Sequence, residues 1–388
     1  MYSFFYVLIN VIIKEVIMVE VTDVLKKIED NGFEAYVVGG YVRDQLLGIV
    51  STDIDICTNA RVKDILEIFK DTNATSNEYG SVKINSNDYR IDITTYRRDV
   101  KYNGDRKKVE IEYVDNLLDD INRRDFTMNT LCMNKLGDIV DVFNGKKDIE
   151  DHLIRCVGNI EDRLEEDPLR MLRAVRFACV LDFRIEENLY KELKKKRNLI
   201  EKLSMERIKE ELTKMLVSPN ALKGLKMLKE LGFLEYMGIN YNDDIVYISD
   251  ICGMYSQLEF IKEYPFSKEE RGNIKNIKSI LKYGIIDNNI IFDYGLYLSM
   301  VAGKILGVDA EDITVMDKNL PIHRYKDMDI NSKEICEVLD IKPSKVLNTV
   351  LEDLKEKILN NELENTKEQI RKYLLDSRGK WLDEGASS

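Results

Sequence analysis

The sequence contains little histidine, proline and tryptophan: two, five and one residues in a chain of 388. Two histidines, His152 and His323, are too few for a His-Asp dyad or a His-rich metal cluster. The six cysteines are scattered and include no C-x-x-C pair, which argues against a disulfide framework or a zinc site. We interpret them as small buried hydrophobes in a reducing compartment. With few glycines and no low-complexity stretch, disorder is not expected away from the ends.

The chain also lacks an excess of positive charge, because its formal net charge is −12. Phosphate contacts need clustered Lys and Arg, so this balance argues against a general nucleic-acid binder. A local basic surface on an acidic protein stays open. The run from Lys191 through Lys194 to Arg197 is one candidate, and a solvated helix face is the alternative interpretation.

No convincing membrane span is present. Residues 1–18 are apolar but are interrupted by Lys14 and Glu15, and the run is short for a bilayer. It also lacks the basic start and the small-residue cleavage site of a signal peptide. We interpret this extension as the result of a translation start assigned too early, with Met18 as the true start. A short membrane anchor is the alternative. The sequence therefore predicts a cytoplasmic protein without a membrane partner.

The hydrophobic pattern changes near residue 150. Before it, period-2 runs rich in β-branched residues alternate with helical patterns; these strand-like runs are Ala35–Val38, Thr52–Cys57, Ser81–Ile84, Tyr89–Thr95 and Val109–Val114. After it the period is 3.6, as in the stripe Leu222, Leu225, Leu228 and Leu231 and in the stripe Val346, Leu347, Val350, Leu351, Leu354 and Ile358. We expect an α+β protein with a small mixed-sheet head followed by an all-helical extension.

Two carboxylates share one predicted strand face. Asp53 and Asp55 alternate with Ile54 and Ile56, so both acids point to one side while the isoleucines pack into the core. Adjacent carboxylates repel unless a cation lies between them. Magnesium takes a few carboxylates plus substrate phosphates, which suits phosphoryl transfer. A D-x-D pair alone is more often a solvated strand edge. Asp92 is a candidate third ligand or a merely nearby acid.

A paired-glycine turn precedes this strand. Gly39 and Gly40 connect an apolar strand to a helix, and such a turn lets the backbone approach a ligand while the helix start offers N–H groups to phosphate. Arg43, one turn into the helix, can reach the same phosphates. An ordinary tight turn is the alternative.

Four motifs, in a fixed order along the chain, resemble those of a known enzyme family. Gly39–Asp44 with Asp53-Ile54-Asp55 resembles the first motif of the bacterial-type (class II) CCA-adding enzyme and poly(A) polymerase family, within the polymerase β-like nucleotidyltransferases. The other three segments similar to motifs of that family are Arg123–Asn129, Glu166–Arg176 and Ser204–Glu211. The resemblance covers roughly residues 19–376.

The resemblance implies a domain order and an activity. It implies a catalytic head at 19–150, a neck at 151–216, a body at 217–310 and an RNA-binding tail at 311–388, after the uncertain extension 1–18. It implies template-independent addition of CCA to the 3′ end of tRNA from CTP and ATP with Mg²⁺. Asp53 and Asp55 would hold the metal, with Asp92 as the further candidate. The implied nucleotide-binding residues are Gly40, Arg43, Arg124, Asp125, Asn129, Asp167, Arg170, Arg173 and Arg176.

Base selection is expected at Asp167 and Arg170, because an i, i+3 pair shares one face of a helix. Cytosine and adenine both present an amino donor beside a ring-nitrogen acceptor. A carboxylate can accept from the first and an arginine can donate to the second. An N-cap role for Asp167 before Pro168 is the alternative. Three arginines at spacing three (Arg170, Arg173 and Arg176) favour an anion site.

Which member of the family this is depends on the connection from Thr94 to Arg123. It keeps Tyr102 and Arg106, where the resemblance implies a loop needed to switch from C to A addition, and it has Lys107-Lys108 where the family often has Arg-Pro. The lead hypothesis is full CCA addition. The alternatives are a poly(A) or A-only enzyme and a catalytically dead RNA-binding protein. A monomer and a homodimer both stay open.

Overall fold

The computed structural model of the chain describes residues 20–72, 74–76, 80–85, 90–101, 110–343 and 345–382. The extension 1–18 and the loop residues Tyr102, Arg106, Lys107 and Lys108 lie outside the described residues. The contacts divide the chain into two compact units. Unit 1 comprises residues 1–240 and 260–265, and unit 2 comprises residues 241–259 and 266–388. The finer division into head, neck, body and tail stays a prediction.

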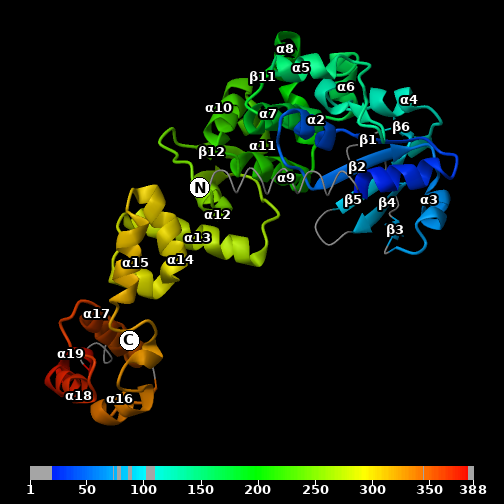
Figure 1. The fold of residues 1–388 in the computed structure, drawn as a ribbon. Coiled ribbons are helices and arrows are strands. Elements are labelled where there is room, and N and C mark those ends of the chain that lie inside the picture. Colours follow the sequence, from blue (N-terminus) through cyan, green and yellow to red (C-terminus); the bar gives the residue numbers. More distant parts are fainter. Residues whose placement is uncertain are drawn as a thin grey trace, which may run out of the picture. The chain divides into compact units, whose positions relative to one another are not determined.

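Unit 1 begins with a mixed α/β head that follows a helix at residues 20–29 (Figure 1). Its first elements are β1 (Ala35–Val38), α2 (Gly40–Leu46), β2 (Asp53–Thr58), α3 (Val62–Ile68), β3 (Ala74–Ser76), β4 (Ser81–Asn85), β5 (Arg90–Thr95), β6 (Arg97–Lys101) and β7 (Glu110–Tyr113). They are followed by α4 (Leu117–Asn122), the 3₁₀ turn η2 (Thr127–Asn129), β8 (Cys132–Met133), β9 (Ile139–Val140) and α5 (Gly145–Glu150).

A mixed sheet organises the head. Among the described residues its strand order is β3-β4-β5-β2-β1-β8-β9, and β2 pairs in parallel with β5 but antiparallel with β1. Ile54 and Ile56 are buried to 0% and 1% exposure, and Asp53 and Asp55 on the opposite face are exposed. The alternation predicted for this strand is thus confirmed. The register sets Asp55 opposite Val38 on one side and Asp92 on the other.

The rest of unit 1 is mostly helical. It contains β10 (Leu153–Ile154), α6 (Ile160–Glu166), α7 (Leu169–Val180), β11 (Arg184–Ile185), α8 (Glu187–Lys195), η3 (Arg197–Lys202), α9 (Met205–Leu216), α10 (Ala221–Leu231) and α11 (Phe233–Met237). Leu225, Leu228 and Leu231 are buried on α10, but Leu222 is 38% exposed. Leu222 therefore does not belong to the buried stripe predicted for this helix, because it stands at the edge of the apolar face in the first turn.

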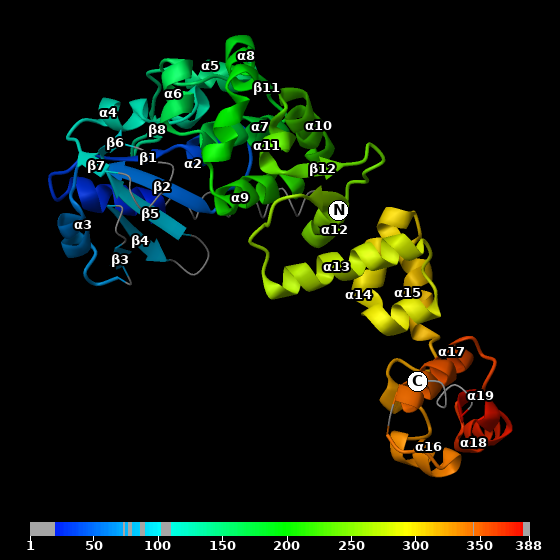
Figure 2. The ribbon, with the colours of Figure 1, turned by 180° about the vertical axis from the view of Figure 1, so that it is seen from behind.

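Unit 2 is almost entirely helical, as Figure 2 shows from behind. The chain passes from unit 1 to unit 2 within β12 (Ile239–Tyr241). The elements that follow are α12 (Ile251–Ser256), β13 (Leu258–Phe260), α13 (Lys268–Tyr283), α14 (Asn288–Leu306), α15 (Ala310–Lys318), η4 (Tyr325–Asp327), α16 (Ser332–Leu339), α17 (Lys345–Leu359), α18 (Lys367–Asp376) and α19 (Arg378–Leu382). Gly295 kinks α14 with a φ of 79°. Along α17, Leu347, Val350, Leu354 and Ile358 of the predicted stripe are buried, whereas Val346 and Leu351 are only half-buried.

The α+β fold is confirmed: a mixed-sheet head precedes a mostly helical remainder. The sequence did not predict the short strand pair β10-β11 in the helical part. Strands of two residues are too short to leave a period-2 signal. No helix in the described part of the chain is long and apolar enough to cross a membrane.

Candidate active site

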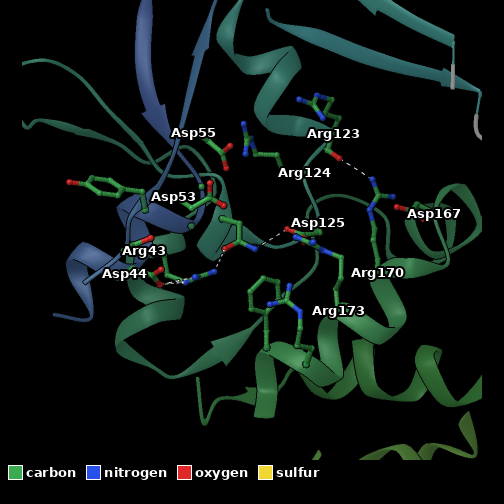
Figure 3. A pocket seen from close by; sticks show the side chains of 17 residues that line it. Arg43, Asp44, Asp53, Asp55, Arg123, Arg124, Asp125, Asp167, Arg170 and Arg173 are labelled. Carbon is green, nitrogen blue, oxygen red and sulfur yellow. Dashed lines mark hydrogen bonds and ion pairs between the residues drawn. The ribbon is translucent and has the colours of Figure 1, made fainter. Parts of the chain in front are cut away.

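One pocket in unit 1 gathers residues from four separate stretches of sequence (Figure 3). Its volume is about 420 Å³. It is lined by Gly39, Gly40, Tyr41, Arg43, Asp44, Ser51, Asp53, Asp55, Arg123, Arg124, Asp125, Asn129, Asp167, Arg170, Arg173, Arg176 and Phe177. Every residue that the sequence predicted to bind nucleotide lines it, together with Asp53 and Asp55. Asp92 lies outside this lining.

The glycine turn lies directly beside the carboxylate strand. Gly39 follows β1 and adopts a φ of 79°, in the region that favours glycine. A Cβ on Gly39 would stand 3.1 Å from the Nη1 atom of Arg124. The left-handed backbone and this tight approach to Arg124 both favour glycine at position 39.

Asp53 and Asp55 present their carboxylates to the pocket without protein partners. Within the described residues, neither side chain takes part in a hydrogen bond or an ion pair. The pocket walls desolvate the carboxyl group of Asp55 and raise its pKa; Arg124 opposes this shift, and the negative charges of Asp53 and Asp92 add to it. A cation between the two acids would relieve this repulsion.

Asp53 and Asp55 offer two neighbouring carboxylates, the ligand type that a divalent cation at the predicted metal site would need. The described residues contain no group of three or more His, Cys, Asp or Glu arranged to hold a metal ion. A hard cation bound here would thus take its remaining ligands from nucleotide phosphates and water, as magnesium commonly does. The carboxylate of Asp92 is instead bound by Arg90, with the Nη2 atom 2.5 Å from Oδ2. Its role as a ligand stays a prediction.

A chain of hydrogen bonds connects the glycine turn to helix α7. Arg43 donates through Nη1 to Asn129 Oδ1 at 2.7 Å and through Nη2 to Asp44 Oδ1 at 2.7 Å. Asn129 donates to Asp125 Oδ1 at 3.0 Å, and Arg173 donates through Nε to Asp125 Oδ2 at 2.6 Å. We call Asp44, Arg43, Asn129, Asp125 and Arg173 the polar relay.

The electrostatics of the relay hold Asp125 ionised. Its burial alone would raise the pKa, but Arg173 and the N–H donors of Asn129 and Phe126 outweigh burial and lower the pKa to about 2. A buried carboxylate with such partners orients the groups around it.

The tandem arginines Arg123 and Arg124 are held by a carboxylate that the sequence analysis did not single out. Asp120, fully buried on α4, accepts from Arg123 Nη2 at 2.9 Å and from Arg124 Nη2 at 3.3 Å. Burial opposes ionisation of Asp120, but Arg123 and Arg124 lower its pKa overall. The i, i+3 and i, i+4 spacing from Asp120 was a signal that could have revealed this anchor.

Asp167 and Arg170 do not share a helix, which corrects the expectation drawn from their spacing. Asp167 has an extended backbone, φ −140° and ψ 96°, between α6 and α7, and α7 begins only at Leu169. Pro168 removes an N–H donor and disfavours a helical conformation at the residue before it. Asp167 Oδ1 also accepts from the Leu169 backbone N–H at 3.1 Å, so part of the capping alternative holds.

Asp167 and Arg170 are each held in place by hydrogen bonds to other residues. Arg207, in the first turn of α9, donates through Nη2 to both carboxylate oxygens of Asp167, at 3.1 and 3.3 Å. Arg170 donates to the backbone carbonyls of Arg163, at 2.6 Å, and Arg123, at 2.9 Å. These hydrogen bonds tie the two side chains to different parts of unit 1.

Phe177 is a lining residue that sequence reasoning missed. The guanidinium groups of Arg43, Arg173 and Arg176 lie over its ring, at 5.1, 5.3 and 3.9 Å from the centroid. Arg176 is also bound by the buried Glu211 of α9. The face of the aromatic ring attracts all three guanidinium groups through cation–π interactions, which stabilises the like charges close together. The sequence did offer a signal for Phe177, because this aromatic residue directly follows Arg176.

Family models match three consecutive parts of the chain. They are the Poly A polymerase head domain at residues 35–155, the "Probable RNA and SrmB- binding site of polymerase A" at 182–238, and tRNA nucleotidyltransferase domain 2 at 254–374.

Relatives that match most of the chain agree with these family models. The CCA-adding enzyme of Ligilactobacillus salivarius is 33% identical over 359 residues, 84% of this chain and 89% of that protein. That of Enterococcus faecalis is 30% identical over 86% of this chain and 90% of its own length. The structure of the Bacillus stearothermophilus CCA-adding enzyme in complex with CTP superposes with a TM-score of 0.81 at 25% identity, covering 94% of this chain and 98% of that one. On this similarity the chain belongs to the family of CCA-adding enzymes.

Proposed function

We propose that the pocket of unit 1 is where this tRNA nucleotidyltransferase adds C and A to tRNA 3′ ends from CTP and ATP, without a template and with release of pyrophosphate. The observation that carries the proposal is the convergence of a carboxylate pair, a set of arginines and the separately held Asp167 and Arg170 in one pocket of about 420 Å³. Relatives of known structure include complexes with CTP and with tRNA.

Asp53 and Asp55 are the proposed magnesium ligands. Bound there, the metal would supply the positive charge that favours the 3′-oxygen as a nucleophile and neutralises the triphosphate. The protein's own part is to hold two carboxylates side by side, on a strand whose other face is packed in the core. The exposure of both acids to the pocket supports this assignment.

The arginines are the proposed triphosphate site. Six arginines and five aspartates line the pocket. Because Asp120, Asp125 and Glu211 fix the directions of Arg124, Arg173 and Arg176, the phosphates would meet donors that need little reorganisation. Such preorganised charge is the main way in which a protein speeds phosphoryl transfer.

Asp167 and Arg170 are the proposed base-reading pair. The carboxylate of Asp167 would accept from the exocyclic amino group of cytosine or adenine, and Arg170 would donate to the adjacent ring nitrogen. Uracil and guanine would place a donor against Arg170 and an acceptor against Asp167. Arg207 orients Asp167 by donating to both of its carboxylate oxygens.

For the helical part we propose a neck at 151–216, a body at 217–310 and an RNA-binding tail at 311–388. The matches to a polymerase RNA-binding model and to a tRNA nucleotidyltransferase domain support this division.

The decisive experiment supplies the purified chain with Mg²⁺, CTP and ATP and a tRNA that lacks its CCA end. We expect three added nucleotides in the order C, C, A, read on a sequencing gel, and none in EDTA. Incorporation of A without C would favour the A-only alternative. Binding of tRNA with no incorporation of either nucleotide would favour a catalytically dead RNA-binding protein.

A further inference from the structure

Strand β5 places one arginine beside the carboxylate pair of β2. The two strands pair in parallel, and their register sets Arg90 next to Asp53. The same register sets Asp92 next to Asp55. Because alternate residues of paired strands share one face of a sheet, Arg90 and the three acids all project from the face that carries the carboxylate pair. The isoleucines of β5 are buried on the other face.

Arg90 holds the carboxylate of Asp92 through two hydrogen bonds. Its Nε atom donates to Asp92 Oδ1 at 3.2 Å, and its Nη2 atom donates to Oδ2 at 2.5 Å. This two-point contact occupies both oxygens of the carboxylate. The Asp92 side chain is 16% exposed and the Arg90 side chain is 50% exposed. A partly buried acid is thus paired with an arginine that solvent can still reach.

The charge of Arg90 interacts with all three acids. The pKa of Arg90 is raised, mainly by the hydrogen bond to Asp92 and by the charge of that residue, and further by the charges of Asp53 and Asp55. Burial raises the pKa of Asp55, the charges of Asp53 and Asp92 add to this rise, and Arg90 counteracts it. Arg90 therefore acts as a counter-ion that the chain itself supplies to this group of acids.

The three acids do not together form a metal site. Although the register brings Asp53, Asp55 and Asp92 to neighbouring positions, the part of the chain that the structure describes holds no group of three ligating side chains arranged around a metal ion. Further carboxylate ligands raise the affinity of a protein site for a hard cation. A cation held by β2 would have to compete with Arg90 before it could gain Asp92 as a ligand, because both oxygens of Asp92 accept from that arginine.

We propose that Arg90 competes with the bound cation for Asp92 and so lowers the metal affinity of the carboxylate pair. The inference rests on the proposed function, which assigns magnesium to Asp53 and Asp55. Arginine suits this role because its guanidinium matches a carboxylate at two points and keeps its charge at every physiological pH. A site limited to two protein carboxylates depends on nucleotide phosphates for further ligands, so the metal and the nucleotide favour each other's binding.

The test measures the binding of Mn²⁺, which prefers the same oxygen ligands as Mg²⁺, to the purified chain without nucleotide. The concentration of free Mn²⁺ is read from its electron paramagnetic resonance signal. We expect Arg90→Ala to bind Mn²⁺ about 10-fold more tightly than the native chain, because Asp92 becomes available as a third carboxylate ligand. Arg90→Ala/Asp92→Asn should return to within about twofold of the native affinity, because it lacks both the competitor and the additional ligand.

Lys83→Ala is the matched control for a simple effect of charge. Lys83 on β4 is the register partner of Asp92 on the side away from β2, and within the described residues it forms no ion pair. Its replacement removes the same charge as Arg90→Ala but releases no carboxylate. It should therefore change the Mn²⁺ affinity less than about threefold. Equal gains in Lys83→Ala and Arg90→Ala would show that charge alone matters and would overturn the proposal.

A second measurement detects the added ligand itself. The effect of bound Mn²⁺ on the relaxation of water protons depends on how many water molecules it binds. This effect should decrease in Arg90→Ala, where Asp92 replaces a water ligand, and should stay at the native value in Lys83→Ala. Tighter binding in Arg90→Ala with unchanged relaxation would contradict direct ligation by Asp92 and overturn the competition.

The variant Asp53→Asn/Asp55→Asn separates this inference from the proposed function. If it binds Mn²⁺ as tightly as the native chain, the metal assignment in the proposed function fails. If it loses Mn²⁺ binding while Arg90→Ala binds no more tightly than the native chain, the metal assignment stands and the inference about Arg90 alone fails.

Discussion

Removing the Arg207 side chain tests whether Asp167 is a base-reading carboxylate. Arg207→Ala takes two charge-assisted contacts, at 3.1 and 3.3 Å, from an Asp167 side chain that is 25% exposed. Charge-assisted hydrogen bonds contribute roughly 1.5–3 kcal/mol when buried. Because Asp167 is partly open to water, about 1–2 kcal/mol is the appropriate range, which corresponds to a 5- to 30-fold change at about 1.4 kcal/mol per factor of ten.

This loss should appear in kcat/KM for CTP and ATP, measured as single-nucleotide addition to tRNA. The preference for CTP over UTP should fall as well, since a carboxylate free to rotate accepts less selectively from an amino group. Arg207→Lys keeps one cationic donor and should recover part of the preference. Glu201→Ala, an exposed change shortly before the same helix, is the matched control.

The reasoning would be refuted if Arg207→Ala kept both the CTP preference and kcat/KM within twofold of the native protein. It would also be refuted if the whole loss lay in tRNA affinity, because the structure gives Arg207 a contact to Asp167 and no place in the lining of the pocket.

Three further predictions test other parts of the site. Asp53→Asn and Asp55→Asn should each lower nucleotide addition at least about 100-fold while tRNA binding persists, because an amide cannot replace an ionised metal ligand; activity within tenfold of native would contradict the metal assignment. The depressed pKa of Asp125, about 2, stabilises the folded state at pH values above its unfolded pKa near 4. Chemical denaturation should therefore show about 2 kcal/mol of stability lost as the pH falls from 4 to 2, and a smaller loss in Asp125→Asn. Phe177→Leu removes a ring 3.9 Å from the Arg176 guanidinium and should raise KM for CTP roughly fivefold for a contact of about 1 kcal/mol, with an unchanged KM indicating that the ring does not order the arginines.

The carboxylate strand was the most predictable part of the molecule. Alternation of Asp53, Ile54, Asp55 and Ile56 depends only on the period of a strand and on burial of apolar side chains, and both hold in the structure. The α+β class followed in the same way from the change of period near residue 150.

Other features could not be predicted because they depend on which distant residues meet. Asp167 was expected on a helical face with Arg170, yet Pro168 starts the helix after it and Arg207, forty residues on, becomes its partner. The spacing of Asp120 from Arg123 and Arg124 offered a local signal, but its complete burial depends on the packing of distant residues. Local spacing predicts neighbours along one element but not the contacts between elements.

The polar relay has a consequence for how such a protein changes over evolutionary time. Arg43, Asn129, Asp125 and Arg173 come from stretches of sequence up to 130 positions apart, yet each forms a hydrogen bond with the next. Replacing one member leaves a buried partner unsatisfied, so the effects of double replacements along the relay should be strongly non-additive. Chimaeras that exchange the head or helix α7 with a distant relative should then keep activity only where the members on both sides of the junction remain compatible.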